Sequence, residues 1–321
     1  MKINTIILAI SGALALVGNA FAGFSSTVNI YVKSGMDGKI HISQSELEQS
    51  CSAVSGCKSG SFTDASEANA WLVQTLNDYW ADGKTLVFDS DIDFGGFDAF
   101  TPEGECDAQL QSLPFPKGGV VEGNGKSVKN LCFAHDVASG AMKEPVGLFS
   151  QNDGEAAISG LTIENVRIIV NDSRDAENKN LLSDGNLFYP VGTLFGYLKN
   201  GTVETLTLKN VYIKAPFAGG VAGFASQSSF REIQAAENLK IENDVDLSAG
   251  TSVNSGKGVA VSNFAGSAMV ENYQTVVFPS EYSVFLGGLV GAGKNSSISK
   301  VNVNAEITDL SSLTTRSALG G

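Results

Sequence analysis

Apolar and polar residues alternate with a period of two along most of this chain, which is the pattern of half-buried β-strands. These runs begin at Leu86 and are separated by Gly, Asn, Ser and Asp. Residues 64–81 differ, because their apolar positions recur at helical spacing. Asp64 or Ser66 can cap that helix, and Gly83 follows it as a stop signal. The pattern predicts an all-β protein with one helix near its N-terminus.

The residues before the strand-rich part are expected to form an N-terminal capping region, 23–84. Residues 24–62 read as irregular, with one short alternating run at 28–32. Both tryptophans, Trp71 and Trp80, lie on the predicted helix. They could bind a sugar, but we interpret them as core residues that plug the open end of a stacked β structure.

Two short elements recur along the chain, and such repeats must be recognised before a fold is assigned. The first is a box of small and apolar residues, found at 146–150, 191–196, 219–223, weakly at 264–266, and at 287–291. The second follows each box; Ile158–Ile168 matches Val203–Ile213 position by position. An earlier half-copy runs from Val128 to Phe133.

Within the second element the strand alternation changes phase once. Leu161 and Ile163 define one inward face, Val166 and Ile168 define the next, and the phase slips at Asn165. Asn tolerates the left-handed backbone conformation that such corners need. The sequence therefore predicts a corner at Asn165, and a ladder in which it stacks on the equivalent Asn210.

The spacing of the boxes predicts a β-solenoid. The boxes end at positions 150, 196, 223, 266 and 291, so their spacings are 46, 27, 43 and 25 residues. About 25 residues suits one coil. A longer spacing is either one coil with an inserted loop or two coils with one degraded box. Residues 171–189 read as such a loop, and loops of this kind often carry the binding site.

The ordered set resembles the GLUG-motif family of bacterial surface proteins over residues 85–307. Besides the boxes, the likeness rests on Leu86–Phe94 and on the lead-in Phe115–Lys126, where Glu122 replaces the usual Asp. The first box ends in Ser150 rather than Gly, and the fourth is poor. The resemblance implies a right-handed parallel β-helix at 85–310, in secreted or surface-displayed, often adhesin-like proteins. It implies no shared chemistry.

The N-terminus predicts export. Lys2, a short apolar run and Ala20-Phe21-Ala22 form a signal peptide over residues 1–22, and no later segment is expected to span a membrane. Export permits disulfides, and we favour Cys51–Cys57 and Cys106–Cys132 over metal binding or free thiols. The expected location is secreted or on the bacterial cell surface.

Charge limits the partners. The formal net charge is −13, so the chain lacks the basic excess that nucleic-acid backbones require.

At the C-terminus, Ser317–Gly321 resembles Phe285–Gly288, so residues 311–321 are predicted to begin a further, truncated repeat of a longer protein.

One acidic cluster could carry chemistry. Asp89, Asp91 and Asp93 occupy alternate positions, so on a strand their carboxylates share one face. They could bind calcium or serve as acid and base in glycoside hydrolysis. We favour a simpler role, in which they end a strand and cap a turn. No cofactor is expected, with calcium as the exception.

Two outward positions could bind a ligand. Arg167 alternates with the inward Val166 and Ile168, and Tyr212 occupies the equivalent position one repeat later. Alternation therefore predicts that both face solvent, where Arg167 could bind a uronate and Tyr212 could stack on a sugar ring.

These observations predict a non-catalytic, adhesin-like surface scaffold that binds extracellular polysaccharide or a cell-surface glycan. The alternative is a β-helix carbohydrate-active enzyme, either a polysaccharide lyase or a glycoside hydrolase.

Overall fold

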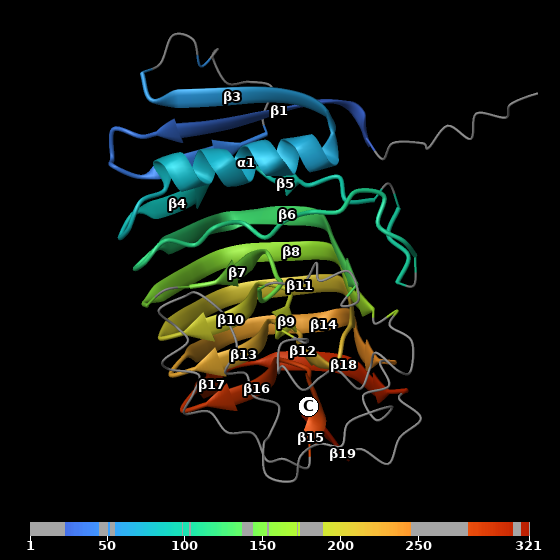
Figure 1. Ribbon diagram of the computed structural model, residues 1–321. Helices are drawn as coiled ribbons and strands as arrows, with labels where there is room; N and C mark the ends of the chain where they lie inside the picture. The colour runs from blue at the N-terminus through green and yellow to red at the C-terminus, as the bar shows by residue number, and fades with distance from the viewer. Residues whose placement is uncertain are drawn as a thin grey trace, which may run out of the picture.

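The computed structural model describes residues 23–44, 51, 55–97, 99–102, 104–136, 144–152, 154–171, 173, 189–244, 282–310 and 316–320. Within these ranges the protein is mostly β, with one helix and largely parallel sheets, as predicted (Figure 1). The strands lie one above another along the length of the molecule, and α1 (Ala65–Tyr79) lies across the N-terminal end.

Three parallel sheets build the stacked part. The longest contains β6 (Val120–Asp136), β8 (Ala156–Asn171), β11 (Gly201–Lys214) and β14 (Ser229–Asn243), followed by β17 (Ser297–Ser299) and β18 (Asn302–Asp309). The second contains β7 (Phe149–Gln151), β10 (Phe195–Lys199), β13 (Ala222–Ser226) and β16 (Val290–Lys294). The third contains β9 (Val191–Gly192), β12 (Phe217–Gly219), β15 (Tyr282–Gly287) and β19 (Arg316–Gly320).

From β8 onward the chain visits these sheets in a fixed order: the long sheet, the third sheet, then the second. We call one such passage a coil. Equivalent residues of successive coils pair directly, so Phe149 neighbours Phe195 and Ile163 neighbours Leu208. The inward side chains of all coils form one continuous hydrophobic core. Burial of these repeated apolar columns is what stabilises the stack.

Glycine in the boxes allows the close approach of neighbouring coils. A Cβ on Gly147 would lie 2.5 Å from the carbonyl oxygen of Gly192, and one on Gly192 would lie 2.6 Å from Cα of Ala222. The apolar residues after the first glycine of each box, such as Leu148 and Leu194, belong to the core. The box is therefore a packing device, in which two apolar side chains are buried and the flanking backbone meets the next coil.

The predicted asparagine ladder is confirmed. Asn130, Asn165, Asn210 and Asn238 all adopt positive φ, between 50° and 58°. Asn165 Nδ2 donates to Asn130 Oδ1 at 3.0 Å, and Asn210 and Asn238 continue the series at 3.0 and 2.9 Å. Asn130 donates in turn to Asp93 at 2.9 Å. Each asparagine side chain thus forms a hydrogen bond with the asparagine one coil away, while its backbone turns the corner of the long sheet.

The coil register explains the uneven box spacing. β8 pairs directly with β11, so the 46-residue spacing is one coil with an insertion. β13 pairs with β16 and β12 with β15, so the coils of boxes 219–223 and 287–291 are neighbours. The weak box at 264–266 lies outside the described residues. β19 pairs with β15 so that Gly320 neighbours Gly287, which is the register that their sequence likeness predicts.

The N-terminal region contains more strand than predicted. β1 (Gly23–Ser34), β2 (Ile40–Ser43) and β3 (Cys57–Asp64) form an antiparallel group, and β2 continues in parallel to β4 (Thr85–Phe88). The prediction of an irregular segment at 24–62 was wrong, because polar strands such as β3 lack apolar alternation and pair through their backbones.

The helix that closes this end is as predicted. Asp64 caps α1, with its carboxylate accepting from the backbone N–H of Glu67 at 2.9 Å. Trp80 lies just after the helix and packs on Phe115 and Phe149, with ring centroids 5.0 and 5.9 Å apart. It therefore joins the cap to the core of the first coils and is not a sugar platform.

Both predicted disulfides are present, Cys51–Cys57 and Cys106–Cys132, with Cα atoms 5.1 and 5.6 Å apart. The second ties residues 97–107, which we call the strap, onto β6 (98 and 103 are not described). Disulfides are compatible with an extracellular protein. No helix in the described part of the chain is long and apolar enough to span a membrane.

Candidate functional site

The two predicted ligand-binding residues lie in one row across the outer face of the long sheet. Cys132 pairs with Arg167, Arg167 with Tyr212, and Tyr212 with Lys240. We call this row the outer column. Val166 and Ile168, on either side of Arg167, belong to the core, so the predicted outward direction is correct. The column is the structural counterpart of the binding surface that the sequence suggests.

Arg167 is nevertheless buried, with 1% of its surface exposed. Its guanidinium lies beneath the strap, where Nη1 donates to the Glu105 carbonyl and Nη2 donates to the Thr101 carbonyl. The ring of Phe97 lies 4.7 Å from Cζ, a cation–π contact. Burial lowers the pKa of the guanidinium, and the charge of Asp107 opposes that shift.

The expectation that Arg167 and Tyr212 face solvent was therefore wrong. Alternation along a strand tells which face of the sheet a side chain occupies, but it does not tell whether another segment covers that face. The strap covers Arg167, and Tyr212 is only 3% exposed. A uronate cannot reach the guanidinium of Arg167 while the strap is in place.

Tyr212 takes part in a buried polar cluster on the same face. Its hydroxyl donates to Glu242 Oε1, and Lys240 Nζ lies 2.9 Å from Glu242 Oε2 and 5.5 Å from the centroid of the Tyr212 ring. Burial acts to raise the pKa of Glu242. The hydrogen bond from Tyr212 and the charges of Lys240 and Lys214 outweigh it and hold that pKa below its ordinary value.

This cluster makes stability pH-dependent. A carboxylate whose pKa is lowered by folding contributes stability above its unfolded value of about 4.3, and that contribution is lost as the pH falls. We expect the wild type to lose more stability than Glu242→Gln between about pH 5 and pH 3, measured by urea unfolding at each pH. Glu237→Gln, at an exposed position of the same strand, should lose as much stability as the wild type over this pH range. Equal acid sensitivity of Glu242→Gln and wild type would contradict this assignment.

The strap contacts predict the effect of removing Arg167. In Arg167→Met the carbonyls of Thr101 and Glu105 lose their buried donor, which costs about 1–3 kcal/mol. We expect faster proteolysis and hydrogen exchange within residues 99–107. Arg231→Met removes an exposed arginine that pairs with Glu204 at 2.8 Å, so it should cost at most about 1 kcal/mol and leave the strap protected. An unchanged strap in Arg167→Met would refute the role of Arg167 as its anchor.

The acidic trio does not form the shared face that its spacing suggests. β4 ends at Phe88 and β5 (Ile92–Asp93) begins after a bend, because the two strands pair with separate stretches of β6. The alternation is broken between Asp89 and Asp91. The trio therefore ends one strand and turns a corner, which is the simpler role favoured from the sequence.

Each carboxylate of the trio has its own partners. Asp91 accepts from the backbone N–H of Ser127 at 2.8 Å, and Asp93 accepts from Asn130. Asp89 contacts His41. In the described ranges no group of three His, Cys, Asp or Glu side chains is arranged to hold a metal ion. The trio as described thus gives no support to calcium binding or to a pair of catalytic carboxylates.

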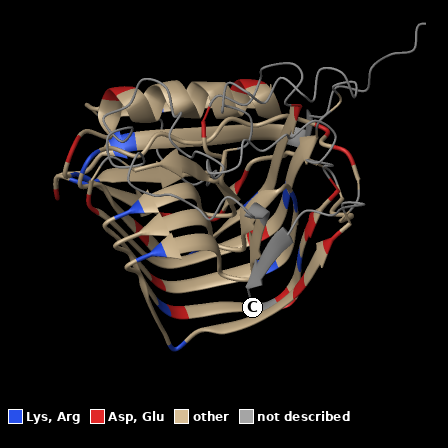
Figure 2. Ribbon diagram, turned by 60° about the horizontal axis from the view of Figure 1, so that its bottom comes forward, with Lys and Arg blue, Asp and Glu red and all other residues tan. Residues whose placement is uncertain are grey.

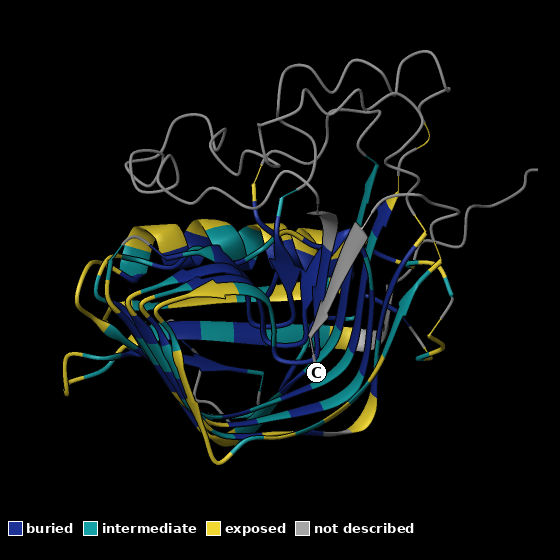
Figure 3. Ribbon diagram, turned by 90° about the horizontal axis from the view of Figure 1, so that it is seen from below, coloured by how far each residue is buried: buried dark blue, intermediate teal, exposed yellow. Residues whose placement is uncertain are grey.

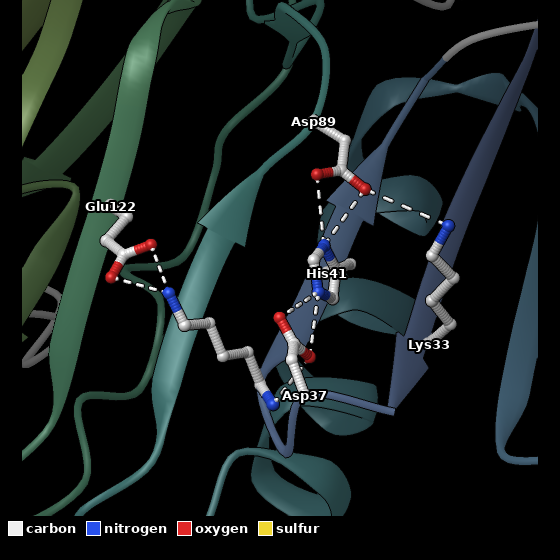
Figure 4. A network of polar contacts seen from close by, with 6 residues as sticks. Lys33, Asp37, His41, Asp89 and Glu122 are labelled. Atoms are coloured by element: carbon white, nitrogen blue, oxygen red, sulfur yellow. Dashed lines mark hydrogen bonds and ion pairs between the residues drawn. The ribbon is translucent and has the colours of Figure 1, made fainter. Parts of the chain in front are cut away.

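Asp89 instead belongs to a network that the sequence did not reveal (Figure 4). His41 Nδ1 lies 3.0 Å from Asp89 Oδ1, while Nε2 on the other side of the ring lies 3.3 Å from Asp37. Lys33 reaches Asp89 at 3.8 Å. The backbone N–H of Lys39 is the main cause that holds the pKa of Asp37 below its ordinary value, and His41 adds to it.

This network links the cap to the coils. Lys39 lies on the turn before β2, which pairs with β4, and β4 pairs with β6; the side chain reaches Glu122 on β6, with Nζ 2.7 Å from Oε2. Both ring nitrogens of His41 face carboxylates of neighbouring segments, so the ring bridges Asp37 and Asp89. Similar pairs cross between coils, such as Lys300 with Glu232 at 3.3 Å, and Figure 2 shows acidic and basic positions interspersed along the strands. The geometry therefore assigns these charges to holding strands together.

No family model, curated protein or solved structure matches the chain. The likeness to the GLUG-motif family therefore stays a prediction that rests on the boxes and the lead-in.

Proposed function

We propose that this chain is an exported, non-catalytic, adhesin-like protein of the bacterial cell surface, folded as a right-handed parallel β-helix, that binds polysaccharide. The observation that carries the proposal is where three strands of the long sheet end. β6, β8 and β14 all end at the same corner, where the long sheet passes to the third sheet. We call it the display corner.

The coil register supports this. β6 ends at Asp136 and β8 at Asn171, and these two residues pair with each other. β14 ends at Asn243, in line with the same edge of β11. The next described strands or bridges begin only at Val146, Val191 and Tyr282. In repeat proteins, connections between repeats that gather along one edge often form the binding surface.

The burial of the outer column changes which ligand we propose. With Arg167 covered and Tyr212 buried, the flat face of the long sheet offers neither residue to a sugar. A net charge of −13 repels polyanions at long range. The proposal is therefore binding of a neutral polysaccharide through the display corner, and the uronate that the sequence allowed at Arg167 loses its support.

Two measurements test the proposal. Cell fractionation with an antibody against residues 23–321 should place the chain on the cell surface or in the medium. Co-sedimentation of the purified chain with insoluble polysaccharides should retain it on a neutral glucan and much less on an alginate or pectate gel. Binding to none of them, or a cytoplasmic location, would refute the proposal.

The same samples test the enzymatic alternative. Release of reducing ends or of unsaturated uronates, abolished in Asp91→Ala, would identify a carbohydrate-active enzyme and overturn the non-catalytic proposal. Among the residues that the structure describes, Asp89, Asp91 and Asp93 have separate partners and do not form a shared site for this alternative.

A further inference from the structure

The strap is a loop that is fixed at both ends. The backbone N–H groups of Gly96 and Leu110, on either side of it, donate to carbonyls of β6 at 2.9 and 3.0 Å. Between these points the strap lies at the surface, with exposed residues at 99, 101, 102, 105 and 107. The Cys106–Cys132 disulfide and the guanidinium of Arg167 hold its middle against the long sheet.

The burial pattern shows that the outer column is covered. Buried positions alternate with intermediate or exposed ones along most of β8 and β11, and Figure 3 shows this mixture in a view along the stack. The alternation stops at three consecutive buried residues, 166–168 in β8 and 211–213 in β11. The middle residues, Arg167 and Tyr212, belong to the outer column. Their burial therefore comes from groups that lie over the outer face, and over Arg167 that group is the strap.

The strap leaves the cation of Arg167 incompletely satisfied. Nη1 and Nη2 donate to two strap carbonyls, but among the described residues Nε is buried and has no hydrogen-bond partner. Burial of a charged group costs free energy that hydration recovers. This cost opposes closure of the strap. The disulfide, whose cysteines are 26 residues apart, is the covalent tie that keeps the strap closed.

The two sulfur atoms of this disulfide have different surroundings. Cys132 is fully buried on β6, whereas Cys106 lies on the strap and is partly exposed. Nη1 of Arg167 lies 4.0 Å from Sγ of Cys132. A neighbouring cation stabilises a thiolate, and the sulfur that forms the more stable thiolate is the better leaving group in disulfide exchange. Access therefore favours attack on Cys106, and the guanidinium favours departure of Cys132.

We propose that the Cys106–Cys132 bond is a site of thiol–disulfide exchange with a dithiol reductant, and that the exchange opens the strap. One thiolate of the reductant attacks Sγ of Cys106. A mixed disulfide forms, the original S–S bond breaks, and its electron pair stays on Sγ of Cys132. The second thiolate of the reductant then attacks the reductant's own sulfur in the mixed disulfide and releases Cys106. The reductant leaves as a disulfide, and its two protons pass to the two cysteines.

Opening changes the outer face of the long sheet. The guanidinium of Arg167 loses the carbonyls of Thr101 and Glu105 and presents Nη1 and Nη2 to solvent. Asp107, whose charge acts on that guanidinium, lies on the strap and moves away with it. Two parallel N–H donors match the two oxygens of a carboxylate. The oxidised chain thus conceals, and the reduced chain exposes, a cationic position on the outer column. This switch is independent of polysaccharide binding at the display corner.

Arginine labelling tests whether the strap opens. In the oxidised full chain, phenylglyoxal should modify the exposed Arg231 and leave Arg167 unmodified, as peptide mass spectrometry would show. After dithiothreitol, Arg167 should react at least roughly tenfold faster, because the cross-link no longer holds the strap, and Arg231 should react as before. Cys106→Ala should expose Arg167 without reductant. The double variant Cys51→Ala/Cys57→Ala lacks the other disulfide and should behave as the wild type in both states.

A monothiol probe tests which sulfur is attacked. Glutathione, with the reaction quenched in acid, should be found on Cys106, with Cys132 as the free thiol. In the reduced chain, alkylation of Cys132 by iodoacetamide should have its midpoint below the ordinary thiol pKa of about 8.5, and Arg167→Met should raise that midpoint. Far-UV circular dichroism and cooperative thermal unfolding should persist after reduction.

Three kinds of result would overturn the proposal. The first is a bond that dithiothreitol cannot reduce in the folded chain, or an Arg167 that stays protected after reduction or in Cys106→Ala. The second is glutathione on Cys132, or an unchanged alkylation profile in Arg167→Met. The third is loss of the folded state on reduction, which would make the disulfide structural and not a switch.

Discussion

Replacing Gly192 by alanine should strongly destabilise the protein. The new Cβ would lie 2.5 Å from the carbonyl oxygen of Phe195 and 2.6 Å from both Cα of Ala222 and N of Gly223. All three are backbone atoms of the packed stack, so no flexible side chain can move aside. We expect a loss of about 3 kcal/mol in the free energy of unfolding. Differential scanning calorimetry should show a melting temperature at least roughly 6 °C lower.

Gly293 supplies the matched control. It lies two residues after the box at 287–291, and a Cβ there would meet nothing closer than 3.7 Å, which is ordinary van der Waals distance. Gly293→Ala should therefore change the melting temperature by little or raise it slightly. If both alanine variants melt at the same temperature, the box glycines do not act through close approach of the coils.

Replacing Asn165 by alanine should have the next largest effect. The change removes the hydrogen bonds to Asn130 and from Asn210, each worth about 0.5–1.5 kcal/mol, and leaves an alanine at φ 57°. A left-handed conformation costs an ordinary residue about 1–2 kcal/mol. We expect a total loss of about 2–4 kcal/mol, measured by urea unfolding.

Asn165→Gly separates the two causes. Glycine adopts positive φ without strain, so it should lose only the ladder hydrogen bonds and unfold between the wild type and the alanine variant. If glycine matched the wild type, the side-chain ladder would contribute nothing and the position would require only its backbone conformation.

Repeat comparison predicted the features that recur in every coil. The boxes, the corner at Asn165 and its stacking on Asn210 follow from the alternation and from one phase slip, because each coil imposes the same contacts on its neighbour. Both disulfides were predicted as well. Features that occur in only one coil could not be predicted by comparing repeats. The strap lies about 60 residues before Arg167, and nothing in the periodicity of β8 shows that it covers that side chain.

A signal for the strap was nevertheless present. The half-copy Val128–Phe133 aligns Cys132 with Arg167, and the predicted bridge to Cys106 brings the strap beside that column. Combining the two inferences would have placed the strap over Arg167. The acidic trio had no comparable signal, because the bend between β4 and β5 depends on pairing with two stretches of β6.

Both disulfides lie at the capped end of the stack, within or before β6, and they use all four cysteines, so no disulfide joins the coils after β6. The molecule therefore has a mechanical polarity. Under tension applied along the axis, the coils after β6, which are joined by hydrogen bonds and packing and by no disulfide, should detach before the cross-linked ones. The cross-linked coils beside α1 should resist longest, because extending them is limited by covalent bonds. A protein held on a surface by its capped end would yield gradually under load and keep its base intact.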